Sequence, residues 1–562
     1  MVPTVAPSSR HRLTAGWSGV SPRRRRGPAG ASTACLTVLL VVGLVGCTNT
    51  FEIQAPNAGP SSTALRRDEG TPVFGGTLRI GVESSVVTLD PSRNIAQGVD
   101  REVALAVYDP LVRYSSDPAH AGEVVPWLIT EWHATDDALT WTLKVHTGIS
   151  FSDGSPFDAT TIVRSYEWRK AKGASCACDL ATIASLTAPD PTTVVITLNT
   201  PRPRLIVDLT RSEWFPVSPK LLDAGGDPNR TPIGTGPFVL SDRDAVVLQR
   251  SDHYWRKDDA GRQLPYLDEV RIVPLLDAQL RLAALRNGDV DLIQTADIVS
   301  ITAARKDNTL ETQLTTANSS TISMANVTKP PFDDPRMRRV TALAFDRDAI
   351  NNQVYGGSAR PAHWLFPEGS PWHDPKARYA DYDPAAARKL LAQIVKEKGD
   401  SVRHFTISCI KSPESDAALQ LVVQQFRDVG LDPQLDLVDQ GTYVAKILSK
   451  SGNYQGGCFR SADAVDPSGH GVSVRTGASG NLTFYSNPRV DQLLDEADAE
   501  RDDTKRRALL NEFQEILAKE GPFSPLIYGV WGNIAREPVD GLPVPEIDNL
   551  GTIRLDGVWI GH

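Results

Sequence analysis

Two aspartates three residues apart, Asp463 and Asp466, stand in the segment FRSADAVDPSG, which follows a short apolar run. Two carboxylates at this spacing are compatible with a catalytic acid and base, with half of a metal site, or with an anchor for a positively charged group of a bound ligand. Nothing within the segment itself decides among these three kinds of site. The elements that position the segment have to be considered first.

The segment follows the last strand of an expected β-α-β-α-β unit. The hydrophobic pattern predicts three strands and two intervening helices, with strands over 404–410, 435–438 and 455–459 and helices over 414–429 and 442–449. Strands that alternate with helices through short loops form a parallel sheet, whose ligands bind beyond the carboxyl ends of the strands. Asp463 therefore lies where a binding site is expected, whereas Asp466, directly before a proline, is expected to shape a turn.

The same unit predicts a disulfide. If its strands follow the common order 2-1-3, Cys409 and Cys458 lie on neighbouring strands, about 4.7–4.9 Å apart, which is within the reach of a disulfide. The C-x-C pair Cys176 and Cys178 has no second cysteine motif with which to bind zinc. We expect these two residues to form either a local disulfide or two free thiols.

The N-terminal region indicates export. A basic cluster at 23–26 precedes a mostly apolar run over 31–45, which is typical of a signal peptide and too short to span a bilayer permanently. The run ends in Leu-Val-Gly-Cys, which resembles the lipobox of bacterial lipoproteins and predicts lipidation of Cys47; an ordinary signal peptide with a chance cysteine is the alternative. We therefore expect a signal peptide over 1–46, a flexible tether over 47–72, and a protein anchored by lipid to the extracytoplasmic face of the cell membrane.

Charge and motifs narrow the function classes. The whole chain carries a formal charge of −9, and because its first 46 residues hold six arginines and no acid, the remainder carries −15. This balance argues against binding to nucleic acid. The chain lacks the nucleophile-elbow, zinc-protease, P-loop and dinucleotide-binding motifs, so we expect no enzyme activity, no cofactor and no metal site.

Six segments, taken together, resemble the peptide/nickel family of extracellular solute-binding proteins, the family 5 partners of ABC importers. They are GGTLRIGVESSVVTLDP, LTWTLKVHTGISFSDGSPFDA, PIGTGPFVL, RNGDVDL, PPFDDPRMRRVTALAFDRDAI and the terminal DGVW. They occur in the order seen in the family and extend from about Gly75 to Trp559. Each segment alone is a modest signal, whereas the ordered set is specific.

The resemblance implies an α/β protein with the two-lobed type II periplasmic-binding-protein fold (cluster C), to which an extra α+β domain is added. Lobe I would combine residues 73–112, 216–325 and 526–562, the extra domain would comprise 113–215, and lobe III, the ligand-binding lobe, would comprise 326–525. Two strands, near Ser323–Val327 and Ser524–Tyr528, would form the hinge. Solute contacts on both lobes would then favour the closed state.

The resemblance also implies site residues. Asp463 matches an aspartate that holds the α-ammonium group of a bound peptide, and Asn481 matches a position near the ligand. Arg460 stands where family members often carry tryptophan; its guanidinium would meet a carboxylate or phosphate of the solute, or pair with Asp463. The remaining expected ligand contacts are polar and aromatic loop residues, namely His470, Arg475, Trp364, Trp372 and Trp214. For the three tryptophans, packing in the protein core is the alternative.

The implied function is the capture of a short peptide, or a peptide-like solute, and its delivery to the permease subunits of an ABC importer by a monomeric lipoprotein. Three alternatives stay open. The same fold binds another solute, such as an oligosaccharide, a glutathione-like molecule or a chelate; or the protein is a non-transporting envelope lipoprotein whose cleft is filled by its own side chains; or it is an extracytoplasmic hydrolase.

Overall fold

The computed structural model describes residues 71–561. The exceptions are residues 94, 96–97, 118–119, 121, 173–181, 369, 371, 412, 461–466 and 544–550, and the side chains of 316–319, 321–322, 413–415, 440, 444 and 460. The predictions for Cys47, Cys176, Cys178, Asp463 and Asp466 fall outside the described residues. Within the described ranges, no helix has both the length and the apolar character needed to cross a membrane.

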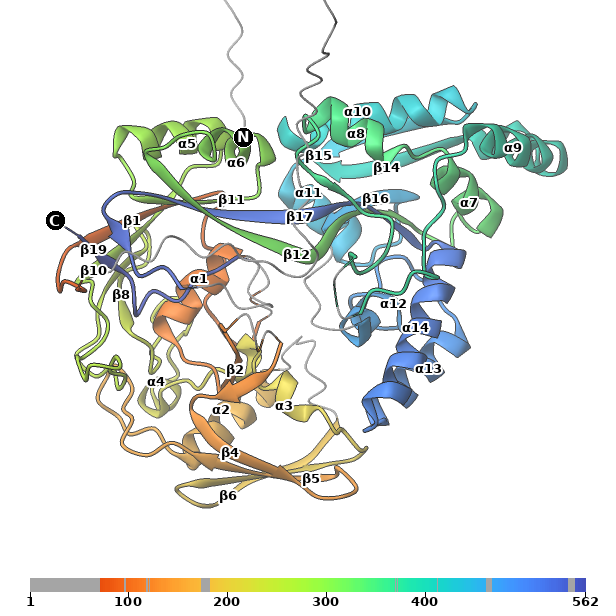
Figure 1. The fold of residues 1–562 in the computed structure, drawn as a ribbon. Helices are drawn as coiled ribbons and strands as arrows, with labels where there is room; N and C mark the ends of the chain where they lie inside the picture. The colour runs from red at the N-terminus through yellow and green to blue at the C-terminus, as the bar shows by residue number, and fades with distance from the viewer. Residues whose placement is uncertain are drawn as a thin grey trace, which may run out of the picture. The chain divides into compact units, whose positions relative to one another are not determined.

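An eleven-stranded sheet forms the centre of the fold (Figure 1). Its order is β15–β14–β16–β12–β17–β11–β1–β10–β9–β8, and β13 pairs with β17 outside this path. The strands are β1 (Thr77–Val82), β8 (Phe238–Asp242), β9 (Val247–Arg250), β10 (Glu269–Pro274), β11 (Leu292–Thr295), β12 (Leu310–Ala325), β13 (Arg360–Pro361), β14 (His404–Ile410), β15 (Asp432–Val438), β16 (Gly456–Arg460) and β17 (Phe523–Arg536).

The two long strands β12 and β17 connect the two halves of this sheet. They run antiparallel, from the pair Met324↔Phe523 to the pair Leu310↔Arg536, and their register shifts twice between Thr316 and Ile322. β12 also pairs with β16 on its other side, and β17 pairs with β11. The segments expected to form the hinge therefore lie on the strands that join the two groups of strands, and the register shifts locally interrupt their ladder.

The parallel unit β14–β15–β16 has the predicted strand order, with β14 between the other two strands. The structure joins the sulfur atoms of Cys409 and Cys458 in a disulfide across β14 and β16, with Cα atoms 5.1 Å apart, a separation that a disulfide readily spans. The helix predicted over 442–449 is instead a short α-helix, α11 (Gln440–Tyr443), followed by a π-helix (Val444–Leu448).

Helices pack against the central sheet and against a smaller antiparallel sheet described below (Figure 1). They are α1 (Gly98–Val107), α2 (Ala159–Ala171), α3 (Leu205–Asp208), α4 (Pro219–Asp223), α5 (Ala278–Asn287), α6 (Ile298–Ala304), α7 (Pro335–Leu343), α8 (Arg347–Val354), α9 (Pro384–Lys398), α10 (Pro413–Asp428), α12 (Gly471–Val474), α13 (Pro488–Ala499) and α14 (Asp503–Glu520). Among the described residues, 3-10 helices also lie at Ser212–Trp214, Asp400–Arg403 and Pro467–His470.

A separate antiparallel sheet lies within the segment expected to form the extra domain. Its order is β4 (Ile129–Ala134), β5 (Thr140–Val145), β7 (Thr193–Leu198) and β6 (Ile183–Asp190). Side chains from this sheet, including Trp141 and Leu143, share a core with Ile162 and Tyr166 of α2. Two strand pairs lie outside both sheets: β2 (Val112–Tyr114) with β3 (Val124–Pro126), and β18 (Val539–Asp540) with β19 (Trp559–Ile560).

Separate hydrophobic cores accompany these groups of strands. One core joins β1 and α1 to Leu248, Val270 and C-terminal residues such as Val558, and two others lie within residues 324–527. Apolar side chains that pack mostly within their own segment give each segment a core of its own. The domain boundaries given above remain a prediction.

Candidate functional site

β16 carries the chain to the predicted ligand loop. Its last residue, Arg460, pairs with Thr321 of β12, so the loop over 461–466 begins beside one of the two long strands. Glycine at 457 allows close packing, because a Cβ atom there would lie 2.9 Å from Cε of Met324. The loop and the Arg460 side chain are not described, so the ligand roles of Asp463 and Arg460 stay predictions.

The chain that follows residue 466 packs against buried side chains of residues 366–506. His470, at the end of the 3-10 helix Pro467–His470, is 5% exposed, and its ring meets that of Phe366 edge to face with centroids 5.7 Å apart. Ser468 in the same helix accepts a hydrogen bond from the Arg506 guanidinium at 3.0 Å. The structure therefore places His470 against an aromatic core.

Asn481 organises the following turn. Its side chain is 1% exposed, and its amide nitrogen donates hydrogen bonds to the carbonyl oxygens of Arg475 at 3.0 Å and Tyr485 at 2.7 Å. Its amide oxygen accepts from the Thr483 hydroxyl at 3.0 Å and from the Tyr485 backbone N–H at 3.2 Å. A buried amide with this many partners fixes the backbone around it.

Arg475 ties this part of the chain to α13. Its guanidinium pairs with Asp498 at 2.6 Å and also with Asp495. Burial raises the pKa of Asp498, and the charge of Arg475 opposes that rise. In the described arrangement, Arg475 thus holds α13 by ion pairs, and a contact with solute remains a prediction.

The three tryptophans have different surroundings. Trp214 is 3% exposed and stacks on Tyr166 in the core of the extra domain, with ring centroids 6.1 Å apart. Trp372 lies under the guanidinium of Arg507, 4.8 Å from its ring centroid, beside the core that also borders His470 and Asn481. Trp364 stacks against the Arg378 guanidinium at 4.4 Å. Stacking of an arginine guanidinium on an indole is stabilising in itself and holds the two groups in place.

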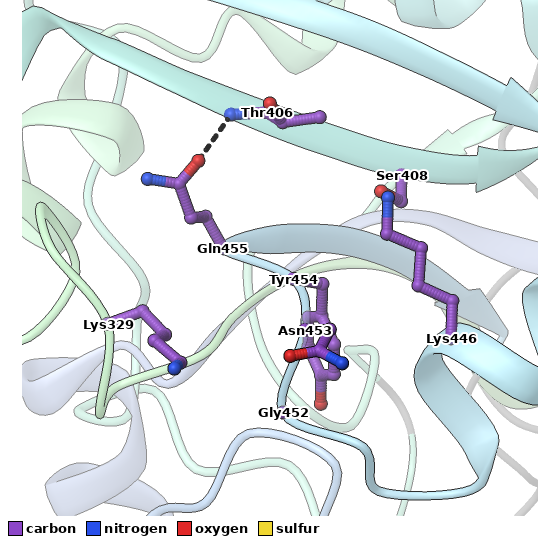
Figure 2. Close-up of a pocket in the computed structure, with 8 residues that line it drawn as sticks. All are labelled: Lys329, Thr406, Ser408, Lys446, Gly452, Asn453, Tyr454 and Gln455. Carbon is purple, nitrogen blue, oxygen red and sulfur yellow. Dashed lines mark hydrogen bonds between the residues drawn. The ribbon is translucent and has the colours of Figure 1, made fainter.

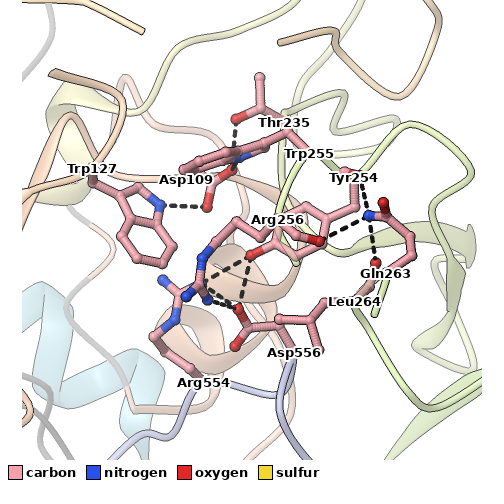
Figure 3. A network of polar contacts seen from close by, with 10 residues as sticks. All are labelled: Asp109, Trp127, Thr235, Tyr254, Trp255, Arg256, Gln263, Leu264, Arg554 and Asp556. Carbon is pink, nitrogen blue, oxygen red and sulfur yellow. Dashed lines mark hydrogen bonds and ion pairs between the residues drawn. The ribbon is translucent and has the colours of Figure 1, made fainter. Parts of the chain in front are cut away.

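Sequence reasoning missed a buried polar network that joins Trp127, directly after β3, to Asp109 and to residues near 235–264 and 554–556 (Figure 3). The Asp109 carboxylate, fully buried, accepts hydrogen bonds from the indole N–H groups of Trp127 at 2.7 Å and Trp255 at 3.1 Å and from the Thr235 hydroxyl at 3.0 Å. Burial raises the pKa of Asp109, whereas the charge of Arg554 and these hydrogen bonds oppose the rise.

A second carboxylate, Asp556, completes the network. It pairs with Arg554 at 3.0 Å and with Arg256, and it accepts a hydrogen bond from the Tyr254 hydroxyl at 2.9 Å. The two guanidinium groups also lie 4.0 and 4.3 Å from the ring centroid of Trp127. Burial raises the pKa of Asp556, but the two arginine charges outweigh that effect and hold the pKa well below its usual range. The network fastens the C-terminal segment to Tyr254, Arg256 and Trp127.

A pocket of about 280 Å³ lies at the start of β16 (Figure 2). Its lining is polar and includes Lys329, Thr406, Ser408, Lys446, Asn453 and Gln455. Lys446 pairs at 2.6 Å with Asp436, which also accepts a hydrogen bond from Ser408 at 2.9 Å. The Gln455 amide oxygen accepts from the Thr406 backbone N–H at 2.9 Å. None of the predicted ligand contacts is among its lining residues, and the side chains of Lys446, Ser408 and Gln455 already have partners within the protein.

Residues 123–467 match a family model, that of the bacterial extracellular solute-binding proteins, family 5 middle region. The chain belongs to this family. It is therefore an extracytoplasmic solute-binding protein that works with an ABC importer, as the ordered motifs predicted, and its α/β architecture is that of the type II periplasmic binding proteins.

Individual relatives agree with the family model. The glutathione-binding protein GsiB of Escherichia coli K12 is 27% identical over 481 residues, which cover 80% of this chain and 88% of the relative. The ABC transporter-associated periplasmic binding protein DppA of Helicobacter pylori, solved with the peptide STSA, superposes with a TM-score of 0.76 at 21% identity, over 87% of this chain and 99% of that one. The oligopeptide-binding protein AppA of Bacillus subtilis, solved with a nonapeptide, superposes with a TM-score of 0.76 at 18% identity, over 88% of this chain and 100% of that one. At these identities the two superpositions show the shared fold.

Proposed function

We propose that this family 5 protein captures short peptides or peptide-like solutes between lobe I and lobe III. The relatives that support this assignment bind glutathione, a tetrapeptide and a nonapeptide, all of which have a peptide character. In this proposal Asp463 holds the α-ammonium group of the solute, and the domain boundaries are those given by the resemblance.

The observation that carries the proposal is the pairing of Arg460 with Thr321. Because β16 ends beside β12, the loop that contains Asp463 begins next to a strand that joins the two halves of the central sheet. A solute held by this loop lies close to the axis about which the lobes move. Contacts with the opposite lobe then favour closure, since a ligand shifts a conformational equilibrium only by its differential affinity for the two states.

The charges at the loop fit a zwitterionic solute. A carboxylate at 463 offers a charge-assisted hydrogen bond to an ammonium group, which contributes about 1.5–3 kcal/mol. A guanidinium at 460 matches a carboxylate in planar geometry. The two residues together recognise the opposite ends of a short peptide or two groups of one amino-acid-like solute.

We also propose that Cys47 carries the lipid anchor and that the protein acts as a monomer at the membrane surface. The lipobox-like sequence supports this assignment. In the producing bacterium, Cys47→Ser should release the protein from the membrane fraction, and incorporation of a palmitate analogue should be lost with it. Continued incorporation in the variant would contradict the assignment.

Native mass spectrometry of the purified protein tests the role of Asp463. The wild-type protein should retain co-purified peptides, and Asp463→Asn should lose them, with an affinity about 10- to 100-fold lower because one charge-assisted hydrogen bond is weakened. Asp466→Asn is the matched control, since it removes a carboxylate three residues away that we expect to shape the turn. Equal retention by Asp463→Asn and wild type would exclude the α-ammonium role.

A further inference from the structure

The turn between α13 and α14 contacts the extra domain. We call residues 498–506 the α13–α14 corner. Asp503 forms an ion pair with Arg204, which directly precedes α3, and the Arg501 guanidinium donates a hydrogen bond at 2.8 Å to the carbonyl oxygen of Thr135, at the end of β4. Both partners belong to residues 113–215, predicted to form the extra domain, whereas the corner lies within residues 326–525, predicted to form lobe III.

Local structure fixes the backbone of the corner. Asp502 is the N-cap of α14, and its carboxylate accepts hydrogen bonds from the backbone N–H groups of Thr504 and Lys505, each at 2.9 Å. Such a cap typically stabilises a helix by about 1 kcal/mol. Asp503 therefore occupies a defined position at the start of α14, even though its own side chain is 80% exposed.

Two buried or half-buried arginines join the corner to the chain that follows the predicted ligand loop. Arg506, 1% exposed, donates to the Ala497 carbonyl at 3.1 Å and to the Ser468 hydroxyl at 3.0 Å. Arg475 pairs with Asp498 at 2.6 Å. The corner, Ser468 and Arg475 are thus parts of one hydrogen-bonded scaffold.

A second charged group of the extra domain lies near the corner. Arg202 pairs with Asp208 of α3 at 2.7 Å, and its positive charge lowers the pKa of Asp498, although burial outweighs this effect. The surfaces that meet here are therefore charged on both sides. Contacts between exposed charges are weak and are screened by salt, so this contact is expected to be reversible and sensitive to salt.

We propose that the α13–α14 corner is a latch, in which Arg204, Arg501 and Asp503 act as positioning residues that stabilise the closed arrangement of lobe III against the extra domain. The proposal rests on the proposed function, because it concerns the closure by which solute is captured. Contacts between segments that separate on opening contribute to the closed state alone. For one exposed ion pair, the expected contribution is about a two- to fivefold change in the ratio of closed to open protein.

Distance measurement between spin labels tests the latch without any solute. The labels are placed on the exposed side chains of α2 and α14 by Glu167→Cys and Glu515→Cys, in the full chain purified in detergent with Cys176→Ser and Cys178→Ser. At low salt we expect a population with a short distance. This population should fall about two- to fivefold when Arg204→Gln or Asp503→Asn is added to the labelled protein. It should fall equally in the labelled protein without these substitutions at 0.5 M NaCl, an ionic strength that strongly screens surface charges.

Two further variants make the outcome specific. The charge swap Arg204→Asp with Asp503→Arg should restore the short-distance population. Arg164→Gln, which removes a comparably exposed ion pair with Asp223 that does not touch lobe III, should leave it unchanged. The latch would be overturned if the labelled protein had no short-distance population at low salt. It would also be overturned if Arg204→Gln and Asp503→Asn left this population unchanged, or if Arg164→Gln reduced it equally. Since no peptide is added, failure here is distinct from failure of peptide binding.

Discussion

Glu102 on α1 accepts a hydrogen bond at 3.0 Å from the side-chain amide of Gln294 on β11, and both residues are buried. The same carboxylate oxygen also accepts from the Ile553 backbone N–H at 3.0 Å, whereas the other oxygen has no hydrogen-bond partner among the described residues. Burial raises the pKa of Glu102 to about 7, and the two hydrogen bonds only partly oppose the rise. The buried carboxyl group of Glu102 therefore titrates near neutral pH.

This carboxyl makes stability depend on pH. Because the folded pKa of about 7 exceeds the unfolded value of 4.5, the folded state binds more protons between these values. The contribution of Glu102 to the free energy of unfolding is therefore greatest below pH 4.5 and declines, by about 3 kcal/mol, as the pH rises through 7. We expect Glu102→Gln to be more stable than wild type at pH 8 and nearly equal to it at pH 4.5.

Urea unfolding of the two proteins at both pH values measures this difference. Glu515→Gln, at an exposed position on α14, serves as the control and should match wild type throughout. If Glu102→Gln showed the same difference from wild type at pH 8 as at pH 4.5, Glu102 would not titrate in this range.

The bond between Cys409 and Cys458 gives a second prediction. A bridge that closes a loop of sequence separation 49 stabilises the folded state by about 4 kcal/mol in the chain-entropy model. Cys409→Ala with Cys458→Ala should lower the free energy of unfolding by roughly that amount. Before this comparison, alkylation of the native protein followed by reduction and a second alkylation should add mass at these two cysteines only in the second step. Labelling of either cysteine in the first step would contradict the disulfide.

A third prediction concerns the buried ion pairs of Asp556. Asp556→Asn leaves two arginines, Arg554 and Arg256, without their carboxylate in a buried site, and breaking such a pair lowers stability by about 3–5 kcal/mol. Asp268→Asn removes an exposed partner of Arg250 and should change stability by less than about 1 kcal/mol. Thermal unfolding of both variants provides the measurement. Similar losses of stability in the two variants would show that the network around Trp127 does not depend on the charge of Asp556.

Periodic patterns predicted much of lobe III from the sequence. The alternation of apolar residues located β14 and β16, and the order of the parallel strands followed from the common topology of such units. Helix α10 ends at Asp428, before Gly430, whose φ of +95° favours glycine. These features depend on residues that are near one another in the sequence, where spacing carries the information.

Contacts between distant residues escaped sequence reasoning. Asp109, Trp127 and Asp556 meet in one network although no spacing rule connects them, and Asn481 acts through backbone carbonyl groups that leave no pattern in side chains. Trp214 stands directly before Phe215-Pro216, which suggested a loop position, yet its indole packs against Tyr166. Tertiary packing decides the surroundings of such residues, and a linear pattern does not encode it.

Binding of defined peptides tests the central claim most directly. A pool of tetrapeptides with free N-termini and the same pool after N-acetylation are offered in turn to the purified protein, after unfolding and refolding to remove any bound solute, and complexes are counted by native mass spectrometry. We predict complexes with the free pool and at least a tenfold loss with the acetylated pool, because acetylation removes the ammonium group that Asp463 is proposed to hold. Absence of complexes with both pools, or equal binding of both, would contradict the account.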